Sequence, residues 1–430
     1  MALVHRRALL AGSTAALLPG LVRGQEKPSK LTIISHRVHQ LTATEGPGGD
    51  VTAPWRKRNG VELEWVTLDL NAIHDRLFRE ASLSRTHMDL GFMLNTRAVP
   101  DALKLFEPLD PFMAKAPIDN FGDIQQRFVD TFRDRSQPQG GHVGIPYRHA
   151  VNALHYNEQI FADRGVEAPP ALVDDILPIA RKLSHTRSDG AKVAAFAFEA
   201  DNYPTLVQFA RAYGGDLITE DFRLLADQPP MVQALTLIRT LCAEGHLPQN
   251  ITAMSQNDLI GDMQQGKVAM MVFPFGRTVL FNDPKVSKYP GKFRTAFLPG
   301  NREMQSRGEV ITTAEFWSMV IPRNAQHKEL AWDLIRELSE PASTVAEAIN
   351  GNGPIRVSAY DDPRLQKMVP YAAQEATSLK WSRVPMPAFP KSAQAKDIVV
   401  EEMQAAMLGM QPPETSARNL ARRLKPLLPA

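Results

Sequence analysis

The stretch from Gly144 to Phe161, GIPYRHAVNALHYNEQIF, constrains the possible folds of this chain most strongly. It opens on Gly-x-Pro and continues with apolar residues in near alternation, which predicts an extended segment that enters a β-strand. Asn157 follows, and its side chain can cap the free backbone N–H groups of a helix that begins there. A strand that begins after roughly 140 residues is late for a single small core. We therefore expect the chain to leave one domain and enter another within this stretch.

The length of 430 residues also favours two domains, because one ordinary core rarely exceeds roughly 250 to 300 residues. The formal charge is only +2 and no long run of one sign occurs, so we expect no nucleic-acid partner. The single cysteine, Cys242, excludes an internal disulfide, and its helical apolar neighbours predict a buried side chain. Nothing in the sequence calls for a cofactor or a metal ion.

Residues 1–24 have the pattern of a secretory signal peptide. Arg6 and Arg7 precede a mild apolar run that ends at Leu18, and small residues follow it. Paired arginines before a weakly hydrophobic run favour the twin-arginine route, although the general secretory route stays open. No cysteine follows the run, so a lipid anchor on that residue is excluded. We expect a soluble, unanchored protein in the periplasm; a cytosolic protein with an amphipathic N-terminal helix is the less favoured alternative.

The rest of the chain alternates between strand and helix patterns, which predicts an α/β fold with parallel strands. Strands are expected at 30–35, 60–66, 89–93, 192–198, 268–275, 293–298 and 316–321, and helices at 72–82, 174–184, 205–213, 229–244, 328–338 and 414–428. Ligands of such sheets bind beyond the carboxyl ends of the strands, where loops converge. His36, Arg37, Asn95 and Arg97 follow two of these strands and become candidate site residues by position.

Five stretches, in order, resemble the family 1 extracellular solute-binding proteins, the group that includes maltose-binding protein. They are GIPYRHAVNALHYNEQIFADRGVEAPPAL, ARAYGGDLI, QQGKVAMMVFPFG, FWSMVIPRNAQHKELAWDLIRELSEPAS and GNGPIRVSAYDDP. Together they span nearly the whole chain after the signal pattern. One departure is Glu315-Phe316, which replaces the small residues usual before the tryptophan, Trp317.

This resemblance implies a two-lobed periplasmic-binding-protein fold with a hinge and a ligand cleft between the lobes. It places the crossings between lobes near 147–150, 290–293 and 338–343. One lobe is then expected to contain residues 31–148 and 291–338, and the other 149–290 and 339–430. The implied function is to capture a small solute and deliver it to the permease subunits of an ABC importer, and we expect a monomer.

The resemblance points first to a sugar as the ligand. Tyr147, Phe275 and Trp317 are expected to stack on it, although Trp317 could instead be a core residue because it alternates with other apolar residues. The basic candidates, with Arg148, outnumber the acidic ones, which disfavours a polyamine and permits a sugar acid or a polyol phosphate. The candidate ligand-binding residues are His36, Arg37, Asn95, Arg97, Tyr147, His149, Glu199, Phe275, Arg277, Glu315 and Trp317.

The sequence contains none of the usual catalytic or metal-binding motifs. It has no H-E-x-x-H, no G-x-S-x-G, no phosphate loop ending in G-K-[ST], and no cysteine or histidine cluster at metal spacing. We therefore predict no catalytic residue and no enzymatic activity. A secreted hydrolase with an unrecognised active site is the alternative reading, and turnover of a bound compound would favour it.

Overall fold

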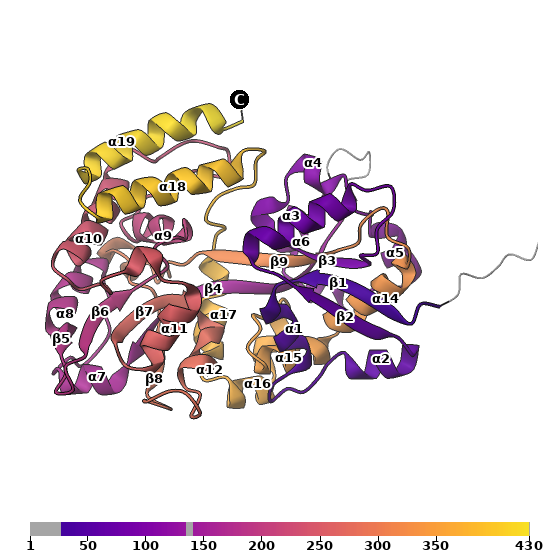
Figure 1. The fold of residues 1–430 in the computed structure, drawn as a ribbon, viewed down its shortest axis with the longest axis horizontal. Coiled ribbons are helices and arrows are strands. Elements are labelled where there is room, and N and C mark those ends of the chain that lie inside the picture. Colours follow the sequence, from indigo (N-terminus) through magenta and orange to yellow (C-terminus); the bar gives the residue numbers. More distant parts are fainter. Residues whose placement is uncertain (1–26, 135–140, 430) are drawn as a thin grey trace, which may run out of the picture.

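A 13-residue strand, β4 (Ile145–Asn157), links the two halves of the molecule in the computed structural model, which describes residues 27–134 and 141–429. Its first half, Ile145 to Val151, pairs with β9 (Ala314–Val320), and its second half, Asn152 to Asn157, pairs with β7 (Val268–Pro274) and β8 (Phe293–Ala296). In Figure 1, β4 and β9 run through the middle, with a lobe on either side. The strand expected from the sequence is therefore shared by both lobes.

The first lobe is built on the strand order β2-β1-β3-β9-β4. The strands β1 (Lys30–Ser35), β2 (Glu62–Thr67) and β3 (Leu90–Leu94) are parallel, and β9 runs antiparallel to β3. Apolar residues from these strands and from the surrounding helices form one core. The helices of this lobe are α1 (Arg37–Thr44), α2 (Ala53–Asn59), α3 (Leu70–Ala81), α4 (Pro100–Leu103), α5 (Asp110–Lys115), α6 (Gln126–Thr131), α14 (Lys328–Ser339), α15 (Pro341–Ile349), α16 (Pro363–Met368) and α17 (Ala372–Trp381).

The second lobe continues the path as β4-β7-β6-β5, with β8 on β4. β6 (Lys192–Ala197) lies parallel to β7, and β5 (His185–Thr186) pairs with β6. A second core lies in this lobe, and Cys242 is half-buried beside it rather than fully buried. The remaining helices are α7 (Glu158–Asp163), α8 (Ile176–Leu183), α9 (Pro204–Ala212), α10 (Pro229–Ala243), α11 (Gln256–Gln264), α12 (Thr278–Phe281), α13 (Arg302–Ser306), α18 (Ser392–Met407) and α19 (Pro413–Leu424).

Two of the expected lobe boundaries are wrong. The boundary at residue 291 would place β8 in the first lobe, but β8 pairs with the second-lobe half of β4, and Phe293 packs with second-lobe residues. The boundary at residue 339 would place α15 to α17 in the second lobe, but their apolar faces complete the first core. The chain enters the second lobe for the last time only before Met386 and α18, which belong to the second core.

The three connections between the lobes lie side by side. Thr312 donates a hydrogen bond from its hydroxyl to the carbonyl oxygen of Asn152 in β4, at 3.0 Å. The next residue, Thr313, forms a parallel bridge with Arg383, and the backbone N–H of Ala314 donates to the Arg383 carbonyl at 3.0 Å. The three crossings are therefore hydrogen-bonded to one another in one place, which is the geometry of a hinge.

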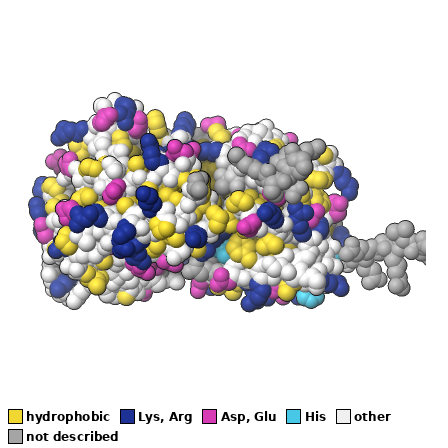
Figure 2. Space-filling model, turned by 90° about the horizontal axis from the view of Figure 1, so that it is seen from above, with side chains coloured by type: hydrophobic (Ala, Val, Ile, Leu, Met, Phe, Trp, Pro, Cys, Tyr) yellow, Lys and Arg dark blue, Asp and Glu magenta, His cyan; other side chains and the backbone are white. Residues whose placement is uncertain are grey.

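The surface charge, the hydrophobicity of the helices and the N-terminal segment bear on where the protein acts. Basic and acidic side chains are interspersed over the face in Figure 2, in keeping with the small net charge. Among the described residues, no helix has the length and apolar character needed to cross a bilayer. The expected signal peptide, residues 1–24, lies outside the described residues.

Candidate functional site

Three polar residues of the second lobe form a hydrogen-bonded group where β6 and β7 end. Glu199 follows β6, Arg277 follows β7, and Gln256 is the first residue of α11. The Gln256 amide donates to the Glu199 carboxylate at 2.7 Å, and the Arg277 guanidinium donates to the Gln256 amide oxygen at 3.3 Å. Burial raises the pKa of Glu199, although the bonds from Gln256 and Asn202 oppose the rise. The sequence predicts that Glu199 and Arg277 follow strands, and they do. It does not single out Gln256, because this residue does not follow a strand.

The first lobe supplies His36 and Arg148 to the same region. His36 follows β1, caps α1, and accepts a hydrogen bond from the Val38 backbone N–H at 3.2 Å. Burial and the nearby positive charges of Arg148 and Arg277 lower the pKa of His36 to about 4. Arg148 lies on β4 and is only 5% exposed. Side chains from both lobes therefore lie near one another in this region, where we expect the ligand cleft.

Two buried groups on the first-lobe side were not anticipated. Tyr371 stacks on Phe275, with ring centroids 5.7 Å apart, and Glu375 lies one turn further along α17. Burial raises the pKa of Glu375 to about 8, against the opposing effects of a hydrogen bond from Tyr360 and of the charge on Arg148. A carboxyl group with this pKa is mostly neutral at pH 7. No pattern in the sequence assigned α17 to the cleft.

A second polar cluster joins the lobes through Glu315 on β9. The Tyr203 hydroxyl, from the second lobe, lies 3.4 Å from a Glu315 carboxylate oxygen. Lys396 of α18 lies over the Tyr203 ring at 5.0 Å and donates to the hydroxyl of Thr96 in the first lobe at 2.6 Å. Burial lowers the pKa of Lys396 to about 8, with Glu315 opposing and Arg97 adding to the shift. The predicted residues Arg97 and Glu315 are thus brought together, with Tyr203 and Lys396 as residues that the sequence did not reveal.

Five predicted site residues are instead buried: Tyr147, His149 and Trp317 on the central strands β4 and β9, Asn95 just after β3, and Phe275 just after β7. Three of them form hydrogen bonds within the protein: the Tyr147 hydroxyl donates to the His39 carbonyl, the His149 ring bonds the Tyr360 hydroxyl at 2.9 Å, and the Asn95 amide oxygen accepts from the Phe316 N–H. The other two pack against rings: Phe275 on Tyr371, and Trp317 on His39 and His74. The rings of Tyr147, Phe275 and Trp317 thus pack on protein side chains, which favours the core reading of Trp317, and stacking of these rings on a ligand stays a prediction.

Arg37 is the last of the predicted residues, and it is exposed on α1. It shares no hydrogen bond with the groups that face the cleft. Arg37 was selected because it follows β1. It is the first residue of α1, however, and its direction is set by the helix rather than by the strand.

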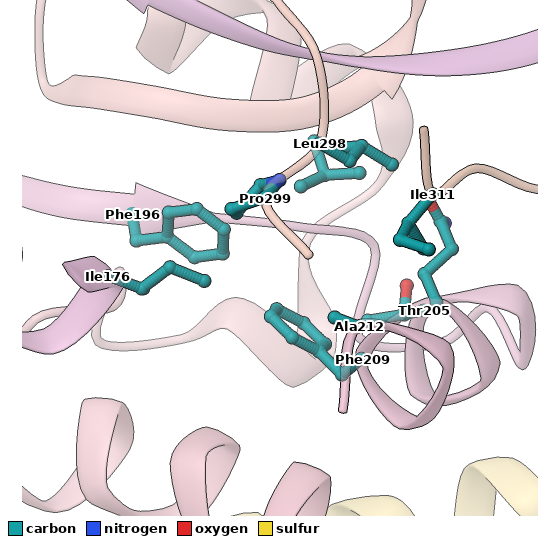
Figure 3. Close-up of a pocket in the computed structure, with 10 residues that line it drawn as sticks. Ile176, Phe196, Thr205, Phe209, Ala212, Leu298, Pro299 and Ile311 are labelled. Carbon is teal, nitrogen blue, oxygen red and sulfur yellow. The ribbon is translucent and has the colours of Figure 1, made fainter. Parts of the chain in front are cut away.

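A separate apolar pocket lies inside the second lobe, between β6, α9 and the segment after β8 (Figure 3). Phe196, Phe209 and Leu298 line it, and none of the predicted site residues does. Its walls offer a ligand almost no polar partner. Among residues 27–134 and 141–429, no group of three or more His, Cys, Asp or Glu side chains could hold a metal ion.

Comparisons with known proteins agree with this geometry. The family described as bacterial extracellular solute-binding protein matches residues 47–345. A putative binding protein of Brucella abortus (strain 2308) is 25% identical over 376 residues, which is 86% of each chain. Among solved structures, maltose-bound MalE3 of T. maritima superposes with a TM-score of 0.80 at 19% identity, over 93% of this chain and 100% of that one. A ribitol complex of an ABC transporter solute-binding protein from Agrobacterium radiobacter K84 gives 0.76 at 19% identity, over 93% and 98%.

Proposed function

Because this chain belongs to the bacterial extracellular solute-binding proteins, we propose that it captures a sugar or polyol derivative between its lobes and passes it to the permease of an ABC importer. The observation that carries the proposal is the meeting of polar side chains from both lobes: His36 and Arg148 on one side, and Glu199, Gln256 and Arg277 on the other. A ligand that contacts the side chains of both lobes stabilises the arrangement in which the lobes are closed. The closed form then indicates that a ligand is bound.

Two further features support the ligand class and the proposed location in the periplasm. The two solved structures described above contain maltose and ribitol, a sugar and a polyol. The sequence pattern of residues 1–24 supports export to the periplasm by the twin-arginine route, without a lipid anchor. The protein is proposed to act as a monomer, and to bind its solute without chemical change.

The test is a thermal-shift screen of the mature protein with neutral sugars, sugar acids, polyols and polyol phosphates. Compounds that raise the melting temperature are then measured by calorimetry, small-angle scattering and product analysis. We expect a ligand that narrows the scattering profile and is recovered unchanged. Gln256→Ala should weaken its binding, whereas Gln233→Ala, on the exposed face of α10, should not. Turnover of the compound would favour a hydrolase instead, and binding without closure would contradict capture between the lobes.

A further inference from the structure

Two arginine side chains, one from each lobe, have no ion-pair partner among the described residues: Arg148 is buried and Arg277 is half-buried. Arg148 of β4 is 5% exposed, and its guanidinium forms no hydrogen bond or ion pair with any residue that the structure describes. Arg277 donates one long hydrogen bond, to Gln256 at 3.3 Å, and its Nε is buried without a partner. Buried charges are normally paired, because leaving water is strongly unfavourable for an isolated ion.

The two guanidinium groups lie at the same end of paired strands. Asn152 of β4 stands opposite Pro274 of β7 in an antiparallel register. Arg148 is four residues before Asn152 and Arg277 is three residues after Pro274, so both positions extend in the same direction from that pair. Each arginine also lowers the pKa of His36, and Arg277 lowers that of Arg148, which places all three groups around one spot.

Neither Glu199 nor Glu375 forms an ion pair with Arg148 or Arg277 among the described residues. Burial lowers the pKa of Arg277, and Glu199 opposes this shift because it favours the charged form. Glu199 is held by Gln256 and by Asn202, at 2.7 and 3.3 Å, and forms no ion pair with Arg277 among the described residues. Glu375 lies near Arg148, but burial raises its pKa to about 8, so it is mostly neutral at pH 7. His36, with its lowered pKa, is neutral as well. The region therefore contains two cations that lack an ion-pair partner among the described residues.

We propose that the solute carries an anionic group, a carboxylate or a phosphate, which binds between Arg148 and Arg277. The inference rests on the proposed capture of a sugar or polyol derivative in this cleft and specifies its charge. A planar guanidinium fork matches the oxygens of either anion, and both forks can donate paired hydrogen bonds. One arginine comes from each lobe, so their positive charges repel each other when the lobes close. A bound anion removes this repulsion, and binding of the anion therefore favours closure.

The first arm of the test uses matched pairs of compounds that differ in charge. D-galactose is compared with D-galacturonate, D-mannitol with D-mannitol 1-phosphate, and ribitol with ribitol 5-phosphate, all at constant ionic strength; inorganic phosphate is compared with chloride. We expect at least one anionic member to bind about ten- to a hundred-fold more tightly than its neutral partner, the scale of charge-assisted hydrogen bonds. Tighter binding of galacturonate would indicate a carboxylate ligand, and tighter binding of the phosphorylated polyols would indicate a phosphate ligand.

The second arm uses Arg148→Gln and Arg277→Gln, with Arg79→Gln and Arg223→Gln as exposed controls, one in each lobe. We expect each cleft variant to lose about tenfold or more in affinity for the anionic compound, and the controls to lose nothing. Without ligand, Arg148→Gln should melt at the same temperature as the wild type or higher, because it removes an unpaired buried charge. A clear fall in melting temperature would show that Arg148 has a structural partner, and would overturn the proposal.

Failure of this inference and failure of the proposed function give different results. Equal or tighter binding of a neutral compound, unaffected by either cleft variant, would overturn the anionic solute and leave solute capture in place. Stabilisation by inorganic phosphate that depends on both arginines, with no sugar or polyol compound bound, would support the anion site and reject the sugar class. If no anion, including inorganic phosphate, stabilises the protein through these arginines, the inference is wrong.

Discussion

The hydroxyl of Tyr203 in the second lobe lies 3.4 Å from a carboxylate oxygen of Glu315 in the first. This contact lies close to the three crossings, because Glu315 follows Thr313 by only two residues. A hydrogen bond between lobes is made only in arrangements where they are close together, so it contributes to ligand affinity rather than to the stability of either core.

Removing this hydroxyl with Tyr203→Phe should therefore weaken ligand binding. We expect a loss of about 0.5 to 1.5 kcal/mol, the net contribution of one hydrogen bond, with little change in the free energy of unfolding. The phenyl ring remains below Lys396, so the packing is kept. Calorimetry and urea denaturation measure the two quantities, and Tyr213→Phe, also in the second lobe, is the matched control. Loss of stability without loss of affinity would contradict a role between the lobes.

Trp317→Ala should destabilise the fold. The indole is 7% exposed and packs against His39 at 4.8 Å and His74 at 5.4 Å between ring centroids. Truncating a buried tryptophan leaves a cavity, and we expect a cost of about 3 to 5 kcal/mol. Trp381→Ala, at a side chain that is 44% exposed, should cost about 0.5 kcal/mol or less. If Trp317→Ala keeps its unfolding midpoint and loses ligand affinity, the indole is a ligand contact after all.

A buried ion pair holds the third connection between the lobes. Arg211 bonds Asp216 at 3.0 Å and donates to the backbone carbonyls of Arg383 and Val384 at 3.2 and 2.8 Å. Arg211→Met leaves Asp216 buried, with the Leu217 backbone N–H at 2.8 Å and the exposed Arg383 guanidinium at 3.4 Å as its remaining partners, and should cost about 3 to 5 kcal/mol. Adding Asp216→Asn should restore part of the loss, and chemical denaturation of all three variants gives the coupling energy. Additive losses would mean that the two side chains act independently.

Glu375 should make stability fall as the pH rises. A carboxyl group whose pKa rises from 4.5 to about 8 on folding holds its proton more tightly in the folded chain. Its contribution is complete below pH 4.5 and is lost as the pH rises toward 8. Relative to the wild type, Glu375→Gln should gain up to about 1.4 kcal/mol per pH unit across this range. Urea denaturation at pH 5, 6, 7 and 8 measures the difference, with exposed Glu167→Gln as the control. Parallel curves for Glu375→Gln and the wild type would show that the carboxyl group titrates normally.

Arg6→Lys combined with Arg7→Lys should stop export if the twin-arginine route is used, since both charges are kept and only the arginine pair is lost. Fractionation of cells that produce the full-length chain measures the periplasmic share. The mature domain purified from the cytosol should melt at the wild-type temperature. Normal periplasmic accumulation of the double variant would instead point to the general secretory route.

The features that the sequence predicted correctly are those encoded locally. Alternation and strand ends identified β1, β6 and β7, and with them the positions of His36, Glu199 and Arg277 after strands. Whether an aromatic side chain near a strand end stays open to ligand depends on residues distant in sequence. The rings that cover Trp317, those of His39 and His74, precede it by more than 240 residues. The sequence did not reveal Tyr371 or Glu375, because the helical pattern of α17 does not show which lobe this helix packs against.

The order in which the chain builds its two cores has a consequence for synthesis. The first core is complete only when Leu379 of α17 is in place, and the second only when Leu424 of α19 is. Neither lobe is a continuous stretch of sequence, so each core needs segments that are synthesised far apart in time, and the second core is completed last. Contacts of such long sequence separation form slowly, and partly built lobes expose apolar surface in the meantime. The two cores are therefore completed at different points of synthesis, and only the second depends on the last two helices.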